Sequence, residues 1–132
     1  MRLERGFMYC AAVAGTLIAV HATAESWNYQ TYYMGQPAAI GYISLEQKDG
    51  DNLFRIVAPR LDPCWQREMK ALVERKESTI VISPLAAVGY CESEVEGTRF
   101  VINADGSGGV RQVKKGSDWV SEGTKRDLTI RK

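Results

Sequence analysis

The chain has 132 residues, with 17 basic and 16 acidic side chains and a single histidine, His21. This length builds one domain with a core of modest size. The formal net charge of +1 lacks the strong basic excess that is typical of nucleic-acid-binding proteins, so we expect no nucleic-acid partner.

The first 24 residues have the pattern of a cleavable secretory signal. Two arginines precede a nearly apolar run at 7–20, and Ala22-Thr23-Ala24 then has the small-x-small pattern that signal peptidase recognises. The apolar run is shorter than the roughly 20 residues that a membrane-spanning helix needs. We therefore predict a signal peptide at 1–24 and a single exported domain at 25–132, periplasmic in a Gram-negative bacterium and secreted otherwise, with no stable membrane insertion after cleavage.

An aromatic stretch opens the predicted domain, and a hairpin follows it. Trp27, Tyr29 and Tyr33 alternate along 25–34, which predicts a strand with these rings on one face. Packing in the core or in cross-strand pairs is the favoured interpretation, and stacking on a sugar or on a partner protein is the alternative. Strands are expected at 38–45 and 53–58, and the Asp-Gly pair between them is the strongest short signal for a hairpin turn.

The stretch at 63–76 fits two structures. Asp62 is a suitable N-cap, and apolar residues recur behind it at helical spacing, which predicts a short helix. Met69, Ala71 and Val73, however, also alternate with polar residues as in a strand. The helix is the favoured interpretation, and the strand stays open as the alternative.

The remaining elements are short strands. They are expected at 79–83, ended by Pro84, and at 97–103, 110–113 and 128–130, with glycine-rich turns between several of them. The fold class predicted from this pattern is mainly β, with α+β as the alternative. We expect a small antiparallel barrel or sandwich with one short helix at 63–76 and one disulfide.

The disulfide is expected between Cys64 and Cys91. These are the only two cysteines outside the signal, and an even pair in an exported domain indicates a bridge. Closing a loop of this length stabilises a domain by roughly 3–4 kcal/mol in the chain-entropy account.

Three carboxylates follow the second cysteine at alternate positions. In an extended chain Glu92, Glu94 and Glu96 project to one side, where they would attract a cationic surface. We take these glutamates as the candidate binding residues, with another protein of basic character as the expected partner.

Catalysis is not expected. Cleavage of the signal removes His21, so a Ser-His-Asp triad, a Cys-His pair and histidine-ligated metals are all excluded, and we predict no metal and no cofactor. The favoured function is a non-catalytic binding protein of the envelope or the extracellular space, of the inhibitor or immunity type. The alternatives are a small hydrolase that uses carboxylates and a structural component of the envelope. In size, signal and single bridge the chain resembles small periplasmic lysozyme inhibitors and immunity proteins, and this resemblance implies no particular site residue.

Overall fold

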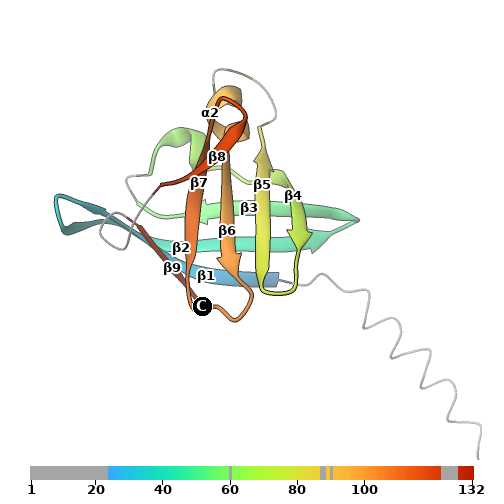
Figure 1. Ribbon diagram of the computed structural model, residues 1–132, viewed down its shortest axis with the longest axis horizontal. Coiled ribbons are helices and arrows are strands. Elements are labelled where there is room, and N and C mark those ends of the chain that lie inside the picture. Colours follow the sequence, from blue (N-terminus) through green and yellow to red (C-terminus); the bar gives the residue numbers. More distant parts are fainter. Residues whose placement is uncertain (1–23, 60, 87–88, 90, 123–127) are drawn as a thin grey trace, which may run out of the picture.

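The computed structural model describes residues 24–59, 61–86, 89, 91–122 and 128–132, so the predicted signal lies, apart from Ala24, outside the described residues. Within these described residues, nine antiparallel strands form one sheet with the order β8-β7-β6-β5-β4-β3-β2-β1-β9 (Figure 1). The strands are β1 (Ala24–Tyr33), β2 (Gln36–Lys48), β3 (Asp51–Val57), β4 (Met69–Arg75), β5 (Thr79–Leu85), β6 (Thr98–Asn103), β7 (Gly109–Lys115), β8 (Asp118–Glu122) and β9 (Leu128–Arg131).

The sheet curls into a half-barrel, and the core lies inside the curl. Strands β1–β3 run across strands β4–β8 (Figure 1). Phe54 of β3 and Phe100 of β6 are fully buried between these two parts, with ring centroids 5.2 Å apart. Lys132 N, directly after β9, donates a hydrogen bond to Gly106 O in the β6–β7 turn at 2.8 Å. This bond joins the β9 end of the curled sheet to the β6–β7 hairpin. The predicted mainly β, antiparallel fold with one disulfide is confirmed, and its sheet has the form of a curled half-barrel.

Two hairpin turns share one backbone conformation. Asp49 and Gly50, between β2 and β3, have φ of 52° and 84°, and Met34 and Gly35, between β1 and β2, have φ of 50° and 81°. Two successive positive φ angles are the mark of a type I′ turn, whose twist matches the flanking strands. The Asp-Gly hairpin predicted from the sequence is thus confirmed.

The helix predicted at 63–76 is wrong. A single 3-10 turn, η1 (Pro63–Trp65), is followed by the strand β4, which is the alternative interpretation. Met69 and Ala71 are buried while Lys70 and Leu72 are exposed, so the period is two. Strand β4 pairs with β5 from Lys70 to Arg75. The stabilisation from this pairing outweighs the local preference for a helix.

The predicted disulfide is confirmed. Cys64 and Cys91 are bonded, with Cα atoms 5.5 Å apart, so η1 is joined to the start of a short helix, α2 (Glu92–Glu96). Helix α2 packs on β5 and β6, and buried Val95 is its contact with the core. No helix in the described ranges is long and apolar enough to cross a membrane.

Candidate functional site

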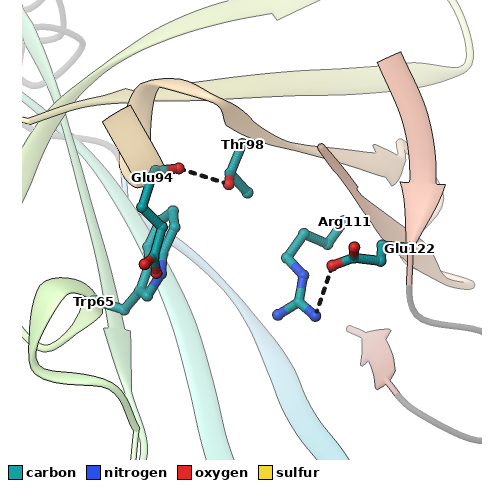
Figure 2. A network of polar contacts seen from close by, with 5 residues as sticks. All are labelled: Trp65, Glu94, Thr98, Arg111 and Glu122. Carbon is teal, nitrogen blue, oxygen red and sulfur yellow. Dashed lines mark hydrogen bonds and ion pairs between the residues drawn. The ribbon is translucent and has the colours of Figure 1, made fainter. Parts of the chain in front are cut away.

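Figure 2 shows polar side chains that gather where η1 and α2 meet the sheet. Trp65 of η1 is 8% exposed, and its Nε1 donates a hydrogen bond to Glu94 Oε2 at 2.6 Å. The Thr98 hydroxyl donates to the backbone carbonyl of Glu94 at 2.8 Å. Glu94 is therefore held in place by its side chain and by its backbone.

Arg111 of β7 is the cation of this region. Its Nη2 lies 3.5 Å from Glu122 Oε1, in the adjacent strand β8. Its guanidinium also lies close enough to the buried Tyr29 hydroxyl to influence the pKa of that phenol. Burial raises the pKa of Tyr29 above its usual value near 10, and the charge and hydrogen bond of Arg111 act against that rise. At neutral pH Tyr29 is thus a neutral phenol beside a guanidinium.

A cavity of about 180 Å³ lies between these groups. Its walls include Arg111 and Tyr29 on one part, Trp65 and Glu94 on another, and Asp62 beside η1. One carboxylate oxygen of Asp62 accepts a hydrogen bond from Cys64 N at 2.8 Å. The cavity therefore combines aromatic walls with charges of both signs.

The three predicted glutamates do not form one acidic face. They lie on the helix α2 and not on an extended chain, so positions two apart point to nearly opposite sides. Glu94 lines the cavity, and Glu92 and Glu96 lie one helical turn apart on the other side of the helix. All three residues are exposed to solvent. The prediction that all three carboxylates project to one side is wrong, because it assumed an extended chain.

A second candidate surface is the β1–β2 hairpin, whose turn projects beyond the body of the protein (Figure 1). Four of the seven large apolar side chains found exposed in the described chain belong to it. Tyr33 and Met34 form the tip and are 71% and 85% exposed, and Ile40 and Tyr42 follow on the outer side of β2. Exposed apolar groups gathered on one element are typical of interaction sites.

Most of this hairpin is also free of charge. From Ser26 to Leu45 no residue is acidic or basic, although a quarter of the whole chain is charged. Depletion of charge together with tyrosine and methionine is the composition of the buried centre of protein interfaces. The uncharged run is visible in the sequence, and sequence analysis missed it by expecting Trp27, Tyr29 and Tyr33 to be packed together.

That expectation was right for the first two rings and wrong for the third. Trp27 and Tyr29 are buried, at 2% and 1% exposure. The pairing of β1 with β2 shifts register between Gln30 and Tyr32, so the strict alternation along β1 ends there. Tyr33 consequently leaves the core and points out at the tip.

Met34 occupies a position that its side chain disfavours. The left-handed region, which it occupies at φ 50°, is sterically costly for residues other than glycine, asparagine and aspartate. The equivalent position in the β2–β3 turn has Asp49, a preferred residue. Strain at an exposed apolar residue is a feature of functional sites, because folding gains nothing from it.

Comparison with known proteins adds no relative. No family model matches the chain, and no curated protein or solved structure matches it. Within the described ranges no three acidic, cysteine or histidine side chains are grouped as a metal site would require. The geometry itself therefore carries the functional argument.

Proposed function

We propose that the protein is an exported, non-catalytic binding protein that recognises another protein through the β1–β2 hairpin. The observation that carries this proposal is the projecting hairpin, which is uncharged from Ser26 to Leu45 and exposes Tyr33 and Met34 at its tip. An inhibitor or immunity-type role is consistent with such a contact, because a protruding loop of this kind fills a hollow in its target.

The chemistry of the hairpin defines its partner. An anionic membrane surface is recognised by lysine and arginine next to aromatic residues, and the hairpin has no basic residue between Ser26 and Leu45. A charged protein surface would likewise leave its own charges unpaired against the hairpin, at a cost in desolvation. The occupant that fits is a partner protein with an uncharged, apolar hollow, into which Tyr33 and Met34 insert.

The exposed acidic side of α2 is a separate part of the proposal. Glu92 and Glu96 would steer a partner of basic character towards the protein, with a rate of association that falls as salt rises. Export is proposed from the signal-like pattern at 1–24, and the bridge between Cys64 and Cys91 supports it because such bridges persist in oxidising compartments.

A photo-crosslinking amino acid placed at Tyr33, in cells that export the protein, tests the hairpin. We expect one protein adduct from this position. The same reagent at Leu72 is the matched control, because Leu72 is an apolar residue of β4 with 63% exposure, outside the hairpin. Tyr33→Ser should then weaken the purified complex by at least about tenfold, as for a central interface tyrosine, and Leu72→Ser should leave it unchanged.

Other outcomes overturn the proposal. Equal adducts from the two positions show that the hairpin is not a specific contact. An adduct with lipid or with a second copy of the chain excludes a different protein as the partner. Turnover of a glycan or peptide by the purified protein would replace the non-catalytic role with the alternative of a carboxylate-based hydrolase.

A further inference from the structure

The cavity between Arg111 and Glu94 has the size for a very small ligand. Its volume of about 180 Å³ corresponds to roughly six water molecules at their share of liquid volume. Pockets for drug-sized ligands begin at roughly 300 Å³. A sugar chain or a nucleotide is therefore too large, and a ligand of a few non-hydrogen atoms fits.

The charges around the cavity are separated and not paired with one another. Glu94 receives the indole N–H of Trp65, and Arg111 reaches Glu122, while no ion pair joins Glu94 to Arg111 among the described residues. Figure 2 shows the Glu94 carboxylate beside Trp65, with the Arg111 guanidinium on the other side of the intervening space. The cavity therefore has an anionic end at Glu94 and a cationic end at Arg111, and each can bind an oppositely charged group of a ligand.

The charged side chains at both ends keep hydrogen-bonding capacity that a ligand can use. Arg111 has five N–H donors in a planar fork that suits a carboxylate, and its contact with Glu122 is long, at 3.5 Å. Glu94 uses one carboxylate oxygen for Trp65, and Asp62 uses one for Cys64 N. The second oxygen of each carboxylate can accept a hydrogen bond from an ammonium group.

The aromatic walls favour the same occupant. Trp65 stands edge-on to Phe100 with ring centroids 5.9 Å apart, and both rings line the cavity with Tyr29. An ammonium group in contact with two carboxylates gains charge-assisted hydrogen bonds, and one that lies over a ring face gains cation–π attraction as well.

We propose that this cavity binds a small zwitterion of the size of a free amino acid, with its carboxylate on Arg111 and its ammonium group on Glu94 and Asp62. The lining of the site includes Tyr29 at the buried base of β1 but neither Tyr33 nor Met34 at the hairpin tip. The zwitterion proposal therefore does not depend on the proposed protein partner.

Three probes separate a zwitterion site from simpler ones. Glycine has both charges, whereas acetate and methylamine each have one. Titration of the purified protein, followed by the indole N–H resonance of Trp65 in NMR spectra, should show glycine binding most tightly. Each single-charge probe should bind at least about tenfold more weakly, because it loses one charge-assisted hydrogen-bonded contact.

Variants then assign the two ends. Glu94→Gln keeps an oxygen for Trp65 but loses the charge, and it should weaken glycine binding at least about tenfold. Arg111→Gln should do the same. Glu96→Gln, on the same helix but outside the cavity lining, is the matched control and should bind glycine normally.

The wild-type titration alone can overturn the proposal, whether or not the variants fold. If no probe shifts the Trp65 resonance at millimolar concentration, the cavity is only a hydrated part of the fold. Acetate as tight as glycine would mean a plain anion site on Arg111. Methylamine as tight as glycine would mean a plain cation site on Glu94 and Asp62.

Discussion

Replacing Met34 by asparagine should make the protein more stable. The left-handed conformation costs a residue with an ordinary side chain about 1–2 kcal/mol, and asparagine tolerates it better through local hydrogen bonds to its backbone. Met34 is 85% exposed, so the change removes almost no buried surface. The expected gain in the free energy of unfolding is about 1 kcal/mol, which corresponds to a rise in Tm of roughly 4–8 °C for a domain near this size.

The β2–β3 turn provides the reverse experiment. Asp49 has nearly the same φ as Met34, 52° against 50°, and is followed by a glycine in the same way. It is exposed, and no ion pair of the described residues includes it. Asp49→Met should therefore lower the free energy of unfolding by about 1 kcal/mol, for the same steric reason with the opposite sign.

Urea unfolding followed by tryptophan fluorescence measures both variants on one scale, since Trp27 and Trp65 are buried. The double variant should return close to wild-type stability, because the two turns are separate and their effects add. A Met34→Asn variant that is less stable than wild type would refute the reasoning, since it would show that the methionine side chain stabilises the isolated fold.

Three further predictions concern the fold. Gly106→Ala should destabilise the protein more than Gly116→Ala, as measured by thermal melts. Both glycines have positive φ, but of the two only Gly106 would place a new Cβ in a clash, with the side chain of Lys132. Reducing the disulfide should lower the free energy of unfolding by roughly 3–4 kcal/mol, measured by urea titration with and without reductant. The raised pKa of Tyr29 means that the folded state holds its proton more tightly than the unfolded state, so this stabilisation is complete below pH 10 and is lost as pH rises above it. Tyr29→Phe should therefore flatten the alkaline limb of the curve of stability against pH.

Local signals predicted the hairpins and strands well. The Asp-Gly turn predicted the β2–β3 hairpin because its preference for positive φ comes from the two residues themselves. The disulfide followed from the count of cysteines. At 63–76 the local signal failed, because helical spacing and strand alternation shared Met69 and Val73, and pairing with β5 decided between them.

Pro84 shows the same dependence on distant neighbours. It was expected to end the strand, yet β5 continues to Leu85. The pairing of β5 with β6 stops at Ile82, so at Pro84 there is no β6 partner to lose a hydrogen bond. The candidate cavity lay beyond sequence analysis for a similar reason, since Tyr29, Glu94 and Arg111 come together only through the curl of the sheet.

The neighbour-by-neighbour order of β1 to β8 has a consequence for how the protein is made. Each strand from β2 to β8 can pair with the preceding one as soon as it leaves the ribosome, and such local pairing favours fast folding. Strand β1 is the exception, because its second partner β9 is the last strand to emerge. Throughout synthesis the outer edge of β1 is open to strands of other chains. A nascent or truncated chain that ends before Leu128 therefore displays its tyrosine-rich first strand as a site for aggregation or for capture by a chaperone.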